Sequence, residues 1–170
     1  VLDRSARRHD VSASGGADVS TPGAGIAADG IDLAGGSERL TGPAFDPADG
    51  AITLSGWVNP TSLTGDSALL AKTGAGGIIY ELVVDGATGE AVARLSIGGS
   101  TVEVRGGTIG TGAWHQIAAT WDGSDVALYV DGVAVDTVSA SGSIGTDRTV
   151  PVTVGNTSTS GAPVVGSVDQ

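Results

Sequence analysis

The sequence has no cysteine and a single lysine, and only six of its 170 residues are aromatic. Without cysteine no disulfide can form, so stability has to come from buried apolar surface or from a bound ion. With no cysteine and two histidines, a zinc site has almost no ligands to draw on. No apolar run is long enough to span a membrane, and no segment has sustained helical periodicity.

Positive charge is scarce, and the net charge is −11. A nucleic-acid-binding protein needs a basic surface that neutralises phosphates, and Arg4, Arg7 and Arg8 form only a short terminal cluster. We therefore expect no nucleic-acid partner and no membrane insertion. Part of the acidity is turn chemistry, because Asp-Gly favours tight turns. Five aspartates precede glycine: Asp29, Asp49, Asp85, Asp122 and Asp131.

The most informative stretch runs from Trp114 to Gly132 and reads WHQIAATWDGSDVALYVDG. It predicts two alternating strands joined by a two-residue Gly123-Ser124 loop, with a second Asp-Gly turn directly afterwards. The predicted core pairs are Ile117 with Val130, Ala119 with Leu128, and Trp121 with Val126. Continuing through the second turn sets Val133 against Val130 and Val135 against Leu128, which predicts a third strand on the same buried face.

Alternation and turn signals predict an all-β chain of twelve short strands in two sheets packed face to face. The expected strands are Gly25–Ala28, Arg39–Thr41, Ile52–Val58, Ala68–Lys72, Ile78–Val84, Ala91–Ile97, Thr101–Arg105, Trp114–Trp121, Val126–Val130, Val133–Val138, Val150–Val154 and Val164–Asp169. The expected surface loops are Ser12–Gly23, Gly106–Gly112 and Ala140–Thr149. No internal repeat and no domain boundary is evident.

The order W-H-x-I-A-x-T-W-D-G followed by L-Y-V-D-G resembles the laminin-G-like (LamG), concanavalin A-like domains of secreted bacterial proteins. Upstream ITLSGWVNPTS and LLAKTG, and downstream VPVTVGN and GSVD, resemble the other strands of that family. The resemblance implies a two-sheet antiparallel jelly-roll sandwich with an extracellular location. We expect residues 1–170 to form one such domain, excised from a longer chain.

Enzymatic activity is not expected. Related sandwich enzymes that cleave glycans place two carboxylates two or four residues apart on one strand. Glu81 and Asp85 are four apart, but Asp85 belongs to an Asp-Gly turn, and Glu103 has no acidic same-face neighbour. His115 is the only histidine in a predicted strand, and its position in the family is a structural one.

Four residues are candidates for ligand binding: Trp57, Trp114, Gln116 and Tyr129. Alternation places Ile52, Leu54 and Val58 in the core and leaves Trp57 on the opposite face, together with the other candidates. Aromatic rings on a polar sheet face can stack on a sugar while amide and hydroxyl groups bind its hydroxyls. The alternative is that the rings serve packing beneath loops. Loop residues around Asp66, Gly76 and Asn156 are a second possible site.

The family resemblance also implies a structural calcium ion. The matching positions are Asp3, Asp29, the Gly30 carbonyl and Asp169, which offer the hard oxygen ligands that calcium prefers. The chain departs from the family at Ala6-Arg7-Arg8, where a glycine-rich turn is usual and where two arginines would weaken the site. The alternative is that Asp3 is a terminal residue and Asp29 only a turn former.

Together these features predict a non-catalytic, lectin-like or adhesive module that binds a glycan or a cell-surface protein. It would serve a larger secreted or surface polypeptide and contact that polypeptide's neighbouring domains. The alternative is a structural spacer or assembly domain without a ligand of its own.

Overall fold

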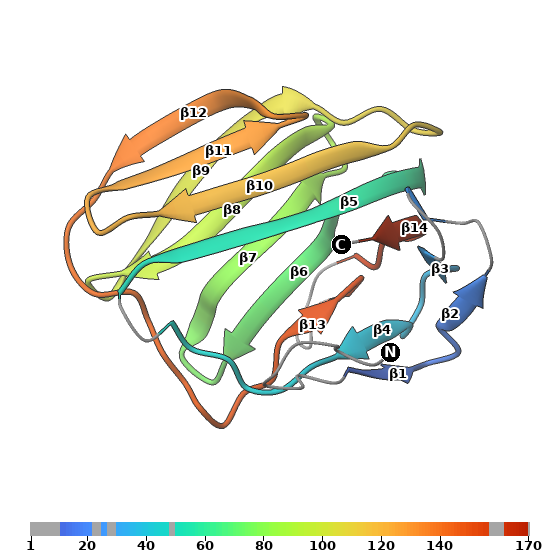
Figure 1. Ribbon diagram of the computed structural model, residues 1–170, viewed down its shortest axis with the longest axis horizontal. Coiled ribbons are helices and arrows are strands. Elements are labelled where there is room, and N and C mark those ends of the chain that lie inside the picture. The colour runs from blue at the N-terminus through green and yellow to red at the C-terminus, as the bar shows by residue number, and fades with distance from the viewer. Residues whose placement is uncertain (1–10, 22–24, 27–29, 48–49, 157–161, 170) are drawn as a thin grey trace.

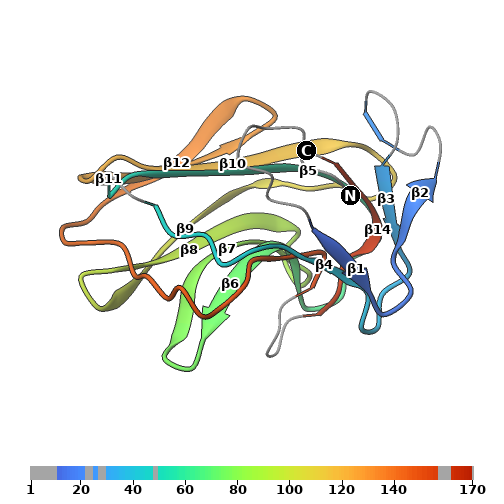
Figure 2. The same ribbon diagram turned by 60° about the horizontal axis from the view of Figure 1, so that its bottom comes forward.

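The computed structural model describes residues 11–21, 25–26, 30–47, 50–156 and 162–169. Over these residues the chain forms fourteen strands, no helix, and therefore no helix that could cross a membrane. Two seven-stranded sheets stack face to face, and all pairs of named strands are antiparallel (Figures 1 and 2). The chain is thus an antiparallel β-sandwich, as the alternation predicted.

We call the two sheets sheet A and sheet B. Sheet A has the order β1-β4-β13-β6-β7-β8-β9: β1 (Ser12–Ser14), β4 (Arg39–Thr41), β13 (Thr153–Val154), β6 (Asp66–Gly74), β7 (Gly77–Asp85), β8 (Glu90–Ile97) and β9 (Ser100–Thr108). Sheet B has the order β12-β11-β10-β5-β14-β3-β2: β12 (Val133–Ser139), β11 (Asp125–Val130), β10 (His115–Trp121), β5 (Ile52–Ser62), β14 (Val165–Asp169), β3 (Gly30–Leu33) and β2 (Asp18–Thr21).

The core lies between the inner faces of the sheets. Its largest fully buried apolar side chains are Trp121, Tyr80, Leu40, Leu82, Leu95, Ile109, Ile117 and Leu128. In sheet B, buried and more exposed positions alternate along β11 and along β5 and β10 apart from the end of β5 and the start of β10, so one face packs and the other meets solvent. Sheet A differs because β7 and β8 are buried on both faces. A second apolar cluster of Ala68, Ala71, Val83 and Val92 explains this difference.

The predicted β10–β11 hairpin is confirmed residue by residue. Ile117 pairs with Val130, Ala119 with Leu128, and Trp121 with Val126. Asp122 closes the turn, because its Oδ1 accepts hydrogen bonds from the N–H groups of Ser124 at 2.8 Å and Asp125 at 2.9 Å. This aspartate is therefore turn chemistry, as its sequence context indicated.

The prediction of a third strand on the same buried face is only partly correct. Val133 does pair with Val130, but its side chain is 64% exposed. A β-bulge between Leu128 and Tyr129 shifts the register, so Leu128 pairs with Asp136 instead of Val135. Bulges increase local twist and redirect side chains, and nothing in the local sequence pattern marks this one.

The N-terminal part also departs from the prediction. The segment Ser12–Gly23, expected to be a loop, contributes β1 and β2. The strand expected at Gly25–Ala28 is instead β3, while Gly25 and Ile26 form a bend and residues 27–28 lie outside the described part. The strand expected at Val150–Val154 is reduced to β13, and β9 extends to Thr108 within the loop expected at Gly106–Gly112. These short segments become strands by pairing with distant partners, which alternation alone does not reveal.

Candidate functional site

The outer face of sheet B brings together three of the four predicted ligand-binding residues. In β5, Ile52, Leu54 and Val58 are buried while Trp57 belongs to the opposite set, as alternation predicted. Trp57 pairs directly with Gln116 of β10. Tyr129 of β11 pairs with Ala118, two residues along β10 from Gln116. Trp57, Gln116 and Tyr129 thus form a contiguous patch across three neighbouring strands, which we call the outer patch.

The side chains of the outer patch are half-buried, and their polar groups remain available. Within the described residues, the Gln116 amide and the Tyr129 hydroxyl make no hydrogen bond to another residue. The positions between them on this face are occupied by Ser55 and Ala118, whose short side chains leave the larger ones prominent. The patch therefore combines apolar ring surface with free hydrogen-bonding groups, which is the composition typical of a sugar-binding surface.

The fourth candidate, Trp114, immediately precedes β10 and is also half-buried. The loop before it is held in place by His115. The His115 Nε2 accepts a hydrogen bond from the Gly110 N–H at 3.1 Å, so Nδ1 carries the proton and donates to Asp131 Oδ2 at 2.9 Å. His115 therefore links the Gly110 loop to the β11–β12 turn, in line with the structural role implied by the family resemblance.

Asp131 completes this arrangement. It adopts a positive φ of 50° in the Asp-Gly turn, and its Oδ1 accepts a hydrogen bond from the Gln116 N–H at 2.8 Å. The hydrogen bond from His115, reinforced by that of the Gln116 N–H, lowers the pKa of Asp131. A charged carboxylate thus lies directly beside the Gln116 end of the outer patch.

Two of the four predicted calcium ligands can be placed. Asp3 and Asp29 lie outside the described residues, but Gly30 begins β3 and Asp169 ends β14. The β14–β3 ladder pairs Val168 with Ile31, so its next step sets Asp169 beside Gly30. Asp169 Oδ2 already accepts a hydrogen bond from the Ile26 N–H at 2.9 Å. In the described part of the chain, no three acidic or histidine side chains converge on a possible metal position.

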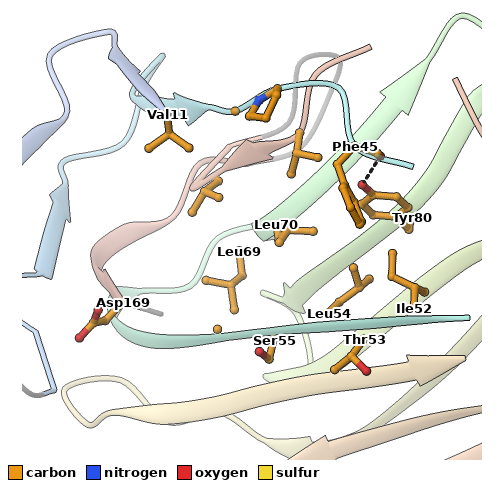
Figure 3. A pocket seen from close by; sticks show the side chains of 15 residues that line it. Val11, Phe45, Ile52, Thr53, Leu54, Ser55, Leu69, Leu70, Tyr80 and Asp169 are labelled. Carbon is orange, nitrogen blue, oxygen red and sulfur yellow. Dashed lines mark hydrogen bonds between the residues drawn. The ribbon is translucent and has the colours of Figure 1, made fainter. Parts of the chain in front are cut away.

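Between the sheets lies a cavity of about 340 Å³ that the sequence did not reveal. Figure 3 shows Ile52 and Leu54 pointing into it from β5, whereas Thr53 and Ser55 point to the other side of the strand. Most of the lining is apolar, and the Tyr80 hydroxyl already donates to the Phe45 carbonyl at 3.0 Å. A sugar would find few hydrogen-bonding groups here, so we favour the outer patch as the glycan site.

At the second possible site, in the loops, the polar side chains already make hydrogen bonds within the protein. Asp66 accepts a hydrogen bond from Arg94 at 2.9 Å, and Asn156 is buried and donates to the Gly36 carbonyl at 2.9 Å. Gly76 lies in the exposed β6–β7 turn. These positions therefore offer fewer available hydrogen-bonding groups to a ligand than the outer patch does.

One buried ion pair was also missed. Lys72, the only lysine, is fully buried and donates to Asp46 and to the Phe45 carbonyl. The second oxygen of Asp46, Oδ2, is buried without a hydrogen-bond partner. A signal was present in the sequence, because the single lysine ends the apolar run LLAK inside a predicted strand.

Comparisons with known proteins agree with the fold. The profile of the concanavalin A-like lectin/glucanases superfamily matches residues 34–170, whereas no curated protein matches the sequence. Domains LG4-5 of the mouse laminin α1 chain superimpose with a TM-score of 0.62 at 19% identity, over 82% of this chain and 39% of that one. The chain therefore spans about two fifths of that laminin fragment.

Two sugar-bound structures are also similar. Domain 4 of AbnA, an extracellular arabinanase from Geobacillus stearothermophilus, was solved with arabinotriose; it has a TM-score of 0.64 at 18% identity, over 94% of this chain and 78% of that one. The CBM40 of a Ruminococcus gnavus sialidase was solved with α2,3-sialyllactose; it has a TM-score of 0.63 at 18% identity, over 82% of this chain and 85% of that one. At these identities the likeness concerns the fold.

Proposed function

Since the chain belongs to the concanavalin A-like lectin/glucanase superfamily, we propose that it is a non-catalytic module that binds glycans through the outer patch of sheet B. The observation that carries this proposal is the direct pairing of Trp57 with Gln116, beside Tyr129, on an otherwise short-chained sheet face. Trp114, at the entrance to β10, is proposed to extend the binding surface.

The chemistry of this patch suits a sugar. A pyranose or furanose ring presents C–H groups on one side, which stack on an aromatic face, and hydroxyls around its rim. The Gln116 amide can both donate to and accept from such hydroxyls, and the Tyr129 hydroxyl can do the same. A hydrogen-bonded sheet is a suitable support because its backbone does not have to reorganise on binding.

The fold comparisons support the same proposal. Two of the similar structures hold oligosaccharides, and this chain spans most of each of those domains. A sandwich of this size is therefore sufficient for sugar binding in those proteins. The proposal extends this property to the present chain, with an extracellular location as part of a larger secreted or surface protein.

A non-catalytic role agrees with how the strand carboxylates are used. Glu81 binds Arg94 at 2.8 Å, and Asp85 binds Arg105 at 2.6 Å. Both therefore belong to ion pairs on the outer side of sheet A. A glycosidase instead needs two carboxyl groups that face a substrate across a cleft at a set separation.

A glycan array followed by titration tests the proposal. Trp57→Ala and Tyr129→Ala should weaken binding by about 1–3 kcal/mol, while the midpoint of unfolding moves little. Thr53→Ala is a matched control, because Thr53 lies on the same face of β5 as Trp57 but four residues away, where it pairs with Thr120. Absence of binding across a broad array would refute the proposal and favour the spacer role.

A further inference from the structure

The two aromatic residues of the outer patch are separated by one intervening strand. Trp57 of β5 pairs with Gln116 of β10, whereas Tyr129 of β11 pairs with Ala118 of β10. Tyr129 is therefore two strands away from Trp57 and is also displaced by two residues along the strand direction. Adjacent strands lie about 4.8 Å apart and each residue advances about 3.4 Å, so the two positions are separated by about 12 Å.

Short side chains cover the sheet between these two positions. Ala118 pairs with Ser55 on one side and with Tyr129 on the other. Gln116 lies two residues further along β10, and its backbone is held in place because its N–H donates to Asp131 Oδ1 at 2.8 Å. The outer patch thus consists of two aromatic side chains with a low strip between them, and the Gln116 amide borders that strip.

The separation sets a minimum length for a ligand that uses both aromatic rings. Partners that stack on an aromatic ring lie within about 4.5–7 Å of its centre, so a single sugar ring stacked on Trp57 does not reach Tyr129. Neighbouring rings of a glycan are joined through one oxygen atom, and their centres lie at roughly half of the Trp57–Tyr129 separation. Three linked rings therefore span it, with the middle ring above the low strip.

We infer that the outer patch is an extended site for three consecutive rings of a linear oligosaccharide that runs diagonally across β5, β10 and β11; this rests on the proposed function of the same site. Trp57 and Tyr129 each stack on one end ring, while the Gln116 amide bonds hydroxyls of the middle ring. The ligand class is therefore a linear glycan chain of three or more units, in contrast to a single terminal sugar.

The test is a calorimetric titration with linear oligosaccharides of increasing length, from monosaccharide to tetrasaccharide. The first series is arabinose, arabinobiose, arabinotriose and arabinotetraose, and the second is the corresponding series of the strongest ligand on the glycan array. The trisaccharide should bind about fivefold or more tighter than the monosaccharide, with the main step between disaccharide and trisaccharide. The tetrasaccharide should add little, because both aromatic rings are already occupied.

Variants show whether the gain with length comes from the two rings. Trp57→Ala and Tyr129→Ala should each abolish most of the gain, because a ligand that stacks on one ring gains nothing by reaching the other position. Thr53→Ala should leave the gain unchanged, since Thr53 lies four residues from Trp57 on the same face. Melting temperatures show which variants are folded, and the wild-type series decides the minimum length even if one variant does not fold.

The two proposals fail in different ways. A monosaccharide that binds as tightly as the trisaccharide, with that binding weakened in Trp57→Ala, would overturn the extended site and leave the glycan-binding function in place. A gain with length that persists in folded Tyr129→Ala would also overturn the extended site, because the added rings would then be bound elsewhere. Absence of binding in both series, or binding that neither aromatic variant weakens, would overturn the proposed function and the extended site with it.

Discussion

Removal of the only lysine should destabilise the fold far more than removal of an ordinary surface charge. Lys72 is fully buried, and the side chain of its partner Asp46 is 5% exposed with one oxygen already lacking a hydrogen-bond partner. In Lys72→Met the hydrophobic volume is retained, but the Asp46 carboxylate is left buried and unpaired. Breaking a buried pair in this way costs about 3–5 kcal/mol, which in a chain of this size lowers the melting temperature by roughly 6–20 °C.

A double variant distinguishes two contributions to the free energy of unfolding: the cost of leaving the Asp46 charge buried without its partner, and the net stabilisation that the ion pair itself provides. In Lys72→Met with Asp46→Asn no buried charge remains, and an amide oxygen can still accept from the Asp147 N–H, which lies 3.1 Å from Asp46 Oδ1. The Phe45 carbonyl keeps its bond from Tyr80. We expect the double variant to recover at least half of the lost stability in a urea titration. A single variant that loses less than about 1 kcal/mol, with no coupling between the sites, would refute this reasoning.

Three further predictions concern stability. Leu128→Ala should cost about 2–5 kcal/mol, because Leu128 is fully buried, and Tyr129→Ala clearly less; equal losses in denaturant would contradict the outward position of Tyr129. The pKa of Asp131 is lower in the folded state than the unfolded value of about 3.9, so its contribution is full above that value and is lost as pH falls through the folded pKa. Wild type should therefore lose stability more steeply than Asp131→Asn in this range, and parallel acid melting curves would disprove the effect. If calcium binds at Asp169, millimolar calcium should raise the melting temperature relative to excess chelator in wild type but not in Asp169→Ala. Identical melting temperatures of the wild type in both media would refute the calcium site.

The parts of the fold that could be predicted from the sequence are those encoded locally. The β10–β11 hairpin follows from alternation and a short Asp-bounded turn, and its register was correct residue by residue. The bulge at Leu128 was not predictable, because it belongs to the pairing of β11 with β12 and not to the sequence of the β10–β11 hairpin. The strands β1 and β2 were missed because a Gly/Ser-rich segment carries no alternation, and β1 is defined by its pairing with β4.

The site shows the same division. Alternation correctly assigned Trp57 to the face opposite Leu54, since that depends on strand periodicity alone. Its direct neighbour Gln116 depends on the β5–β10 register, which joins segments far apart in the sequence. The cavity beside Leu54 arises from packing between the sheets, and Lys72 is buried against the segment between β4 and β5; a single sequence specifies neither contact.

The most direct test of the central proposal uses the three tryptophans, whose indole N–H groups give three NMR signals. Trp121 is 1% exposed in the core and serves as an internal control, whereas Trp57 belongs to the outer patch and Trp114 adjoins β10. During titration with an oligosaccharide selected on the array, the account predicts saturable shifts of the Trp57 signal, with a smaller change at Trp114 and none at Trp121. Saturable binding that leaves the Trp57 signal unmoved would contradict it.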